Sequence, residues 1–150
     1  MRPDALAIGR RPPIARCREL LAECGLPADD LTAAHVEHFL GCGDSAHPDG
    51  IVGLEIHGSD ALLRSLAVTA AVRGRGCGEA LVAEVEALAR AEGIRQLYLL
   101  TTTAEAFFVK RGYARVERGS VPCAIRQTPE FTSLCPDSAS VMCKVLAANA

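Results

Sequence analysis

The sequence predicts a single α/β domain with helices on a mixed sheet. Its 150 residues suit one domain with a core of its own, so residues 1–150 are treated as one unit. Apolar residues make up 49% of the chain and charges of both signs are interspersed, which excludes disordered and collagen-like classes. The predicted elements run as strands, then strand-helix-strand-helix, then strands, and this order is typical of a mixed sheet with helices.

The first third of the chain predicts a strand, a helix and a second strand. A short strand is expected at 5–10, and a helix at 12–27 with proline at its start and glycine near its end. One face of this helix is apolar at helical spacing: Ile14, Cys17, Leu20, Leu21 and Cys24. The segment 29–44 begins as helix or loop and turns into a strand at 37–43.

The middle of the chain predicts a hairpin followed by a long helix. A turn at 45–50 precedes strands at 51–58 and 61–69, which the short "GSD" link joins as a hairpin. The long helix is expected from Gly78 to Glu92, and Gly93 ends it. Its buried face holds Leu81, Val85 and Leu88.

The last third predicts a strand, a short helix and a closing strand. The strand is expected at 95–102 and the helix at 102–112, where Thr102 and Glu105 match a capping box and Gly112 supplies the stop. The tail from 117 to 136 is irregular and long for a compact domain, so we expect it to be covered or functional. A closing strand is expected at 138–146.

Net charge, apolar runs and cysteine spacing limit the classes of partner and the cellular compartment that we expect for this protein. The formal net charge of -2 argues against a nucleic-acid partner, which would show a basic face. The N-terminus has no apolar run for a secretory signal and nothing later approaches a membrane span, so a cytoplasmic protein is expected. The seven cysteines show no Cys-x-x-Cys spacing, which predicts reduced, packed thiols and no metal. His35 and His38, one helical turn apart, are a poor metal signal by themselves.

The segment "VRGRGCGEA" (72–80) lies between a predicted strand and a predicted helix and contains three glycines. Backbone N–H groups at such a helix start bind anions with help from the helix dipole, and glycines let a pyrophosphate approach. The phosphate-binding loop of nucleotide hydrolases needs a following Lys-Ser/Thr, which this segment lacks. The dinucleotide fingerprint fits at Gly74 and Gly76, but its third glycine falls on Glu79.

A third pattern, R/Q-x-x-G-x-G/A, fits as Arg73-Gly74-Arg75-Gly76-Cys77-Gly78. With "LAV" and "AEAFFVKRGY" nearby, the chain resembles the GNAT N-acetyltransferases over nearly its whole length. The resemblance implies a mostly antiparallel sheet, a splay between the strands at 61–69 and 95–102, and acetyl-CoA as cosubstrate. It also implies that the tail from 117 to 136 lies over the acceptor site or across a dimer interface, so a homodimer is expected. The cofactor-binding residues it implies are Leu66, Ala67, Val68, Arg73, Gly74, Arg75, Gly76, Cys77, Gly78, Thr102, Phe107 and Phe108.

The same resemblance implies a base for the attacking amine and an acid for the CoA thiolate. Glu55 is the candidate base, with His57 on the same strand face as the alternative; Glu55 as a solvated strand residue stays open. The family's usual tyrosine acid falls on Phe108, so a water, a threonine of 101–103 or no acid serves here, while Tyr113 is expected to pack.

Cys77 is expected to have a stabilised thiolate, because it lies at a helix start near arginines. A nucleophilic role is rejected, since the resemblance places Cys77 at the pyrophosphate and away from the thioester.

The tail "VPCAIRQTPEFTSLCPDSA" resembles the ending of acetyltransferases encoded in arsenic-resistance operons. That resemblance implies a small-molecule amine acceptor, with amino-acid-like toxins as the example. Arg126 and Thr128 are then candidate ligands of an acidic group, and Arg64 either joins them or pairs with Glu55. A non-catalytic acyl-CoA-binding or arsenical-binding module stays open; its candidate thiols are Cys123, Cys135 and Cys143.

Overall fold

The computed structural model describes residues 7–134 and 138–146. Seven strands form one sheet in the order β1-β2-β3-β4-β5-β7-β6. All neighbouring pairs are antiparallel except β4 and β5, so the predicted mixed, mostly antiparallel sheet is confirmed. The strands are β1 (Ile8–Arg10), β2 (Phe39–Gly43), β3 (Pro48–His57), β4 (Asp60–Val68), β5 (Gln96–Thr101), β6 (Ala114–Arg115) and β7 (Ser140–Val145).

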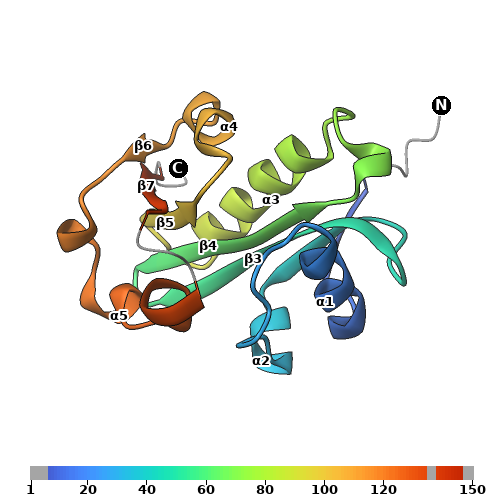
Figure 1. The fold of residues 1–150 in the computed structure, drawn as a ribbon, viewed down its shortest axis with the longest axis horizontal. Helices are drawn as coiled ribbons and strands as arrows, with labels where there is room; N and C mark the ends of the chain where they lie inside the picture. Colours follow the sequence, from blue (N-terminus) through green and yellow to red (C-terminus); the bar gives the residue numbers. More distant parts are fainter. Residues whose placement is uncertain (1–6, 135–137, 147–150) are drawn as a thin grey trace.

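Helices cover both faces of the sheet (Figure 1). The long helix α3 lies with α4 on one face, and α1, α2 and α5 lie on the other. The helices are α1 (Ile14–Glu23), α2 (Ala33–Val36), α3 (Cys77–Ala91), α4 (Glu105–Lys110) and α5 (Cys123–Arg126), with a π-helical turn at Glu130–Leu134. Among the described residues, no helix is long and apolar enough to cross a membrane.

Two helix starts differ from the sequence-based expectation. The capping box predicted at Thr102 and Glu105 is wrong: α4 begins at Glu105 itself, too late for Thr102 to cap it. The Oγ1 of Thr101 instead accepts a hydrogen bond from the amide of Ala104 at 3.0 Å. A reciprocal cap that we did not predict joins Thr32 and His35 at the start of α2.

The tail is less irregular than its sequence suggests. Its apolar residues Val121, Ile125 and Phe131 form a small core against the sheet residues Leu62 and Tyr98. The tail therefore covers the sheet within one chain. The predicted homodimer stays a prediction, for which light scattering at high protein concentration is the measurement.

The strands β4 and β5 pair over a short stretch and then separate. Their parallel register joins Asp60–Leu62 to Gln96–Tyr98, while β4 continues to Val68 and β5 to Thr101. The predicted splay between the two central strands is thereby confirmed, and it leaves one edge of β4 without a neighbouring strand beyond Leu62.

A β-bulge in β4 changes which side chains face which layer. The register with β3 shifts between Ile51 and Gly53, and Ser65 adopts a φ of 61°, in the left-handed region. Before the bulge, the side chain of Leu63 faces the layer that contains α3. After the bulge, the side chains of Leu66 and Val68 face this layer. Strand alternation then directs Arg64 to the opposite face, where α1, α2 and the tail lie.

Candidate active site

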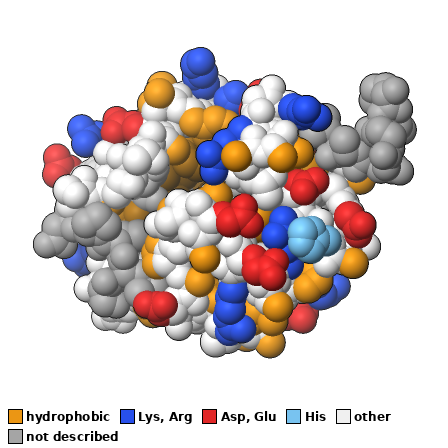
Figure 2. All heavy atoms as spheres, turned by 45° about the vertical axis from the view of Figure 1, so that its right-hand side comes forward, with side chains coloured by type: hydrophobic (Ala, Val, Ile, Leu, Met, Phe, Trp, Pro, Cys, Tyr) orange, Lys and Arg blue, Asp and Glu red, His pale blue; other side chains and the backbone are white. Residues whose placement is uncertain are grey.

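A cleft of about 870 Å³ opens at the splay. Its walls come from β4 beyond Leu62, the loop 24–27 after α1, the glycine loop (72–78), the start of α3, the end of β5 and the α4 region. Glu130 of the tail and Ala139, just before β7, complete the lining. Figure 2 shows a hollow of this kind, with hydrophobic side chains inside it and Lys or Arg side chains at its rim. Since these walls belong to both faces of the sheet, the splay connects the α3 side with the tail side.

The glycine loop gives the cleft an anion-binding end. Gly74 and Gly76 have φ values of 80° and 86°, a conformation that side chains other than glycine rarely adopt. Gly76 is the N-cap of α3, and the first helical hydrogen bond runs from the amide of Ala80 to its carbonyl. The amides of the first helical residues therefore have no partner within the helix and are suited to bind an anion.

The backbone of β4 presents hydrogen-bonding groups to the splay. The amide of Thr69 donates to Asp49 of β3 at 2.9 Å, so these two residues form a hydrogen-bonded pair. The backbone N–H and C=O groups of successive residues in a strand point to alternate sides. The N–H and C=O groups of Val68 and Leu66 therefore point away from β3 and into the splay. The carbonyl of Val68 accepts from Nε of Arg73 at 3.1 Å.

The predicted cofactor-binding residues come together in this cleft, with one exception. Arg75 is exposed and does not line the cleft, although it belongs to the same loop. The others line it: Leu66, Ala67, Val68, Arg73, Gly74, Gly76, Cys77, Gly78, Thr102, Phe107 and Phe108. The sequence motif thus located the cleft, and contact with a ligand stays a prediction.

The aromatic residues of the α4 region pack and offer no acid. Phe108 is 4% exposed and contacts Phe107 and Tyr113 edge to face. The hydroxyl of Tyr113 donates to Glu86 at 2.9 Å, and burial raises the pKa of this phenol well above its ordinary value. Packing is confirmed as the role of Tyr113. The threonines at 101–103 line the cleft, as Phe108 does.

Cys77 differs from the sequence-based expectation. Its side chain is buried against Gly50, and burial, together with the neighbouring Cys42, raises the pKa of its thiol well above the ordinary value. The predicted stabilised thiolate is therefore wrong, because desolvation outweighs the helix N-terminus and the arginines. The six described cysteines are free thiols, as predicted.

Replacing Cys77 by alanine is expected to leave turnover within about threefold of the wild type, because a protonated, buried thiol is no nucleophile. Steady-state kinetics and intact-protein mass spectrometry measure this. A thousandfold loss, or an acetylated protein that disappears with the substitution, would require a covalent mechanism instead.

Arg64 lies at the centre of a buried ion network on the tail side of the splay. Its side chain is fully buried and pairs with Asp30 through both Nη atoms, at 2.6 and 2.7 Å. Nη1 also donates to Glu55 at 3.2 Å, Nη2 pairs with Glu130 at 3.3 Å, and Nε donates to the hydroxyl of Ser65 at 3.0 Å. All five N–H groups of the guanidinium thus face an oxygen atom.

The ionisation of this network follows from its geometry. Burial would lower the pKa of Arg64, but the hydrogen bonds and charges of Asp30, Glu130 and Glu55 raise it above its ordinary value. Burial would raise the pKa of Asp30, but Arg64 lowers it below its ordinary value. The predicted pairing of Arg64 with Glu55 is confirmed, and no N–H group of Arg64 remains for an acidic substrate.

The two candidate bases lie beside this network and do not line the cleft. Glu55 contacts His57 at 2.9 Å through Oε2, and Arg64 through Oε1. His35 of α2 lies 3.4 Å from the same Oε1. Glu55 is therefore not a solvated strand residue, and direct contact with an acceptor in the cleft has no geometric support.

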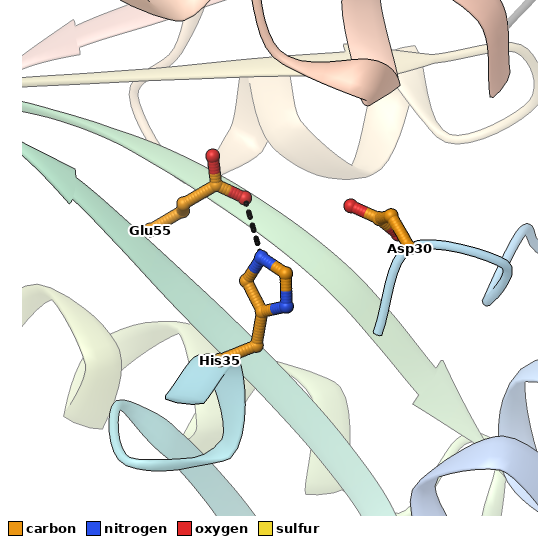
Figure 3. A group of neighbouring side chains, drawn as sticks. All are labelled: Asp30, His35 and Glu55. Atoms are coloured by element: carbon orange, nitrogen blue, oxygen red, sulfur yellow. Dashed lines mark ion pairs between the residues drawn. The ribbon is translucent and has the colours of Figure 1, made fainter. Parts of the chain in front are cut away.

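Asp30, His35 and Glu55 have ligand atoms within 4.8 Å of one another, which is compatible in distance with a metal site (Figure 3). The amide of Thr32 donates to Nδ1 of His35 at 3.1 Å, so Nε2 carries the proton of the neutral ring and faces Glu55. Both carboxylates already pair with Arg64. The donor set therefore fits an ion network better than a metal.

Arg126 and Thr128 lie away from the cleft. Arg126, the last residue of α5, is exposed, and the hydroxyl of Thr128 donates to the carbonyl of Ile125 at 2.7 Å. The tail contributes Glu130 to the cleft instead. Glu130 was not predicted as a site residue. The signal that could have found it is its position within the tail segment "VPCAIRQTPEFTSLCPDSA". Cys135 lies outside the described residues.

Comparisons with known proteins point to one family. An amino-acid acetyltransferase of Ralstonia nicotianae is 42% identical over 57 residues, 38% of this chain and 13% of that protein. An uncharacterized N-acetyltransferase of Chlorobaculum tepidum is 37% identical over 60 residues, 40% of this chain and 38% of that protein. The chain therefore spans less than half the length of either curated relative.

Solved structures share the fold. N-acetylglutamate synthase from Neisseria gonorrhoeae, complexed with coenzyme A and N-acetyl-glutamate, matches with a TM-score of 0.80 at 20% identity, over 95% of this chain and 35% of that one. A Mycobacterium tuberculosis protein in complex with CoA matches with a TM-score of 0.73 at 20% identity, over 94% and 99%. The family model of the acetyltransferase (GNAT) domain matches residues 35–115, more than half of the chain. This chain belongs to the GNAT acetyltransferase family.

Proposed function

We propose that this protein transfers the acetyl group of acetyl-CoA to the amine of a small molecule. The observation that carries the proposal is the cleft, which combines an anion-binding helix start with the unpaired edge of β4. Such a cleft has one end for a pyrophosphate and a strand edge for an extended pantetheine arm. The family and the relatives' names supply the reaction class.

In this proposal the glycine loop and β4 hold acetyl-CoA. The amides between Gly74 and Gly78 bind the pyrophosphate, and the backbone groups of Leu66 and Val68 bind the pantetheine arm like an added strand. Arg73 leaves the carbonyl of Val68, which it contacts at 3.1 Å, and turns toward the pyrophosphate. One amide of β4 polarises the thioester carbonyl, as an oxyanion donor does.

The departing CoA thiolate needs a proton or a hydrogen-bond donor. Phe108 supplies neither, and the phenol of Tyr113 is buried on Glu86. We infer that a hydroxyl of the threonines at 101–103 or a water in the cleft serves, because these threonines line the cleft beside Phe108.

The acceptor is a small amine, and amino acids are the class that the names of the similar proteins suggest. The narrower proposal, an amino-acid-like toxin linked to arsenic resistance, depends on the resemblance of the tail alone. An acidic acceptor group would have to bind elsewhere than at Arg64, whose N–H groups all face oxygen atoms.

Two measurements test the proposed function. Acetyl-CoA should raise the Tm of the purified protein, and free CoA should appear when a panel of amino acids and simple amines is added. Mass spectrometry then identifies the acetylated product. A thermal shift without CoA release from any amine would favour the acyl-CoA-binding module; no shift at all would contradict the cofactor assignment.

The arsenical-binding alternative gains no support from the thiols that the structure describes. Cys123 is exposed and accepts a hydrogen bond from Gln127 at 3.2 Å, whereas Cys143 is half-buried in β7 beside Tyr98. The two thiols have separate partners, so they do not form a ready pair of ligands.

A further inference from the structure

Ser65 lies at the β-bulge of β4 and adopts a backbone conformation that serine rarely takes. Its φ of 61° lies in the left-handed region, which favours glycine. In the register with β3, Ser65 and Leu66 together lie opposite the single residue Val52. Strained residues of this kind persist where the surrounding structure holds them, and they cluster at active sites. The strain therefore points to a function for this residue at the splay.

The hydroxyl of Ser65 has one lone pair in use and a proton without an acceptor. Nε of Arg64 donates to its Oγ at 3.0 Å, and within residues 7–134 and 138–146 this hydroxyl makes no other hydrogen bond. A cationic donor polarises the hydroxyl and makes its O–H group a stronger donor in turn. Ser65 is half-buried and lines the cleft, so an oxygen atom of a ligand in the cleft can accept the free proton.

Ser65 lies inside the splay, between its closed end and the glycine loop. The strands β4 and β5 pair as far as Leu62, and β4 reaches the glycine loop at Val68. At about 3.3 Å per residue, Ser65 lies about 10 Å along β4 from Val68. A pantetheine arm that enters from the glycine loop and follows Val68 and Leu66 therefore brings its acyl group to Ser65.

We propose that the hydroxyl of Ser65 donates a hydrogen bond to the carbonyl oxygen of the thioester and stabilises the oxyanion that forms there. Arg64 is the positioning residue that polarises this hydroxyl. The inference rests on the proposed acetyl transfer and adds a side-chain donor to the amide of β4. A polarised donor suits an oxygen atom that gains negative charge as the amine attacks.

The transfer balances while Ser65 keeps its proton. The lone pair of a neutral amine forms the C–N bond to the carbonyl carbon, and an electron pair of the C=O bond moves to oxygen. When the oxyanion collapses, the C–S bond breaks with its electron pair on sulfur. Nitrogen loses one proton and the CoA thiolate gains one, through a threonine hydroxyl or a water in the cleft.

The first test is the infrared spectrum of bound acetyl-CoA. A hydrogen bond to a carbonyl oxygen lowers the C=O stretching frequency, and an isotopic label on the acetyl carbonyl carbon separates this band from those of the protein. In Ser65→Gly the band should move toward the frequency of free acetyl-CoA, while acetyl-CoA still raises the Tm. Glycine suits a φ of 61°, so this variant removes the hydroxyl without straining the backbone.

The second test is turnover with an amine that the wild type acetylates. Ser65→Gly and Ser65→Ala should each lower kcat about 100-fold, the usual effect of losing one oxyanion donor, and change the acceptor KM little. Both variants remove the same hydrogen bond from Arg64, but alanine keeps the strained backbone, so the alanine variant should have the lower Tm. The matched control is Ser59→Gly, which removes an exposed hydroxyl from the turn before β4 and should leave turnover and the band unchanged.

Three results would overturn the inference. The first is an unchanged carbonyl band, or a kcat within about threefold of the wild type in both variants. The second is a loss with alanine but not with glycine, which would assign the effect to the backbone. The third is a raised acceptor KM with unchanged kcat, which would place the hydroxyl on the acceptor. If acetyl-CoA does not raise the Tm of the wild type, or no amine releases CoA, the proposed function fails instead, so the two failures are distinguishable.

Discussion

Replacing Gly76 by glutamate is expected to abolish the binding of acetyl-CoA. Gly76 is the N-cap of α3 at a φ of 86°, and a Cβ there would point into open space. Glutamate would strain this backbone and place a negative charge where the pyrophosphate is proposed to bind. Turnover should fall with binding, because the cosubstrate is lost.

The expected signal is the loss of a thermal shift. At a hundredfold excess over Kd, a ligand of the native state stabilises it by about 2.7 kcal/mol, a Tm rise of about 5–11 °C at this chain length. Gly93→Glu is the matched control: Gly93 has a φ of 80°, open space around it and a place at the opposite end of α3. Without ligand, Gly93→Glu should lose about as much stability as Gly76→Glu, but its Tm should still rise when acetyl-CoA is added. A shift retained in Gly76→Glu would show that the loop does not hold the cosubstrate.

Much of the fold was predictable because its signals are local. The hairpin of β3 and β4 followed from two apolar runs around "GSD", and α3 followed from its apolar face and the glycines at both ends. The glycine motif, together with the neighbouring "LAV" and "AEAFFVKRGY" segments, identified residues that line the cleft. There the chemistry depends on backbone conformation, which glycine reveals in the sequence.

The ion network around Arg64 was less predictable because it depends on contacts between distant segments. Asp30, Glu55 and Glu130 reach Arg64 from three parts of the chain, and no spacing rule connects them. The bulge that orients Arg64 depends on Ser65 at positive φ, which serine does not signal. Arg126 looked suited to an acidic ligand by residue type, yet α5 leaves it exposed.

Replacing Arg64 by methionine is expected to destabilise the fold by about 3–5 kcal/mol at neutral pH, because three largely buried carboxylates lose the guanidinium that they share. Urea unfolding followed by circular dichroism measures the free energy of unfolding. Arg16→Met is the matched control: Arg16 is also buried, but its carboxylate partners Glu19 and Glu23 are more than half exposed and stay solvated. Its cost should be clearly smaller. Equal costs would mean that lost packing, and not unpaired charge, sets the effect.

The pH dependence of the Arg64→Met penalty separates charge from packing. In the wild type, Arg64 holds the pKa of Asp30 below its ordinary value, so the stability that Asp30 contributes is present above its unfolded pKa and is lost as the pH falls through the folded one. In the Arg64→Met variant, Asp30 is still largely buried and still lies near two other carboxylates. Both factors disfavour its ionised form, so the pKa of Asp30 should lie above its ordinary value in this variant. The folded variant then takes up protons before the unfolded chain does, and its stability rises on acidification. The difference from the wild type should therefore narrow as the pH falls from about 7 toward about 5, a range in which the Arg16→Met difference should stay constant. A difference for Arg64→Met that stays constant over the same range would show that the carboxylates do not interact through this guanidinium.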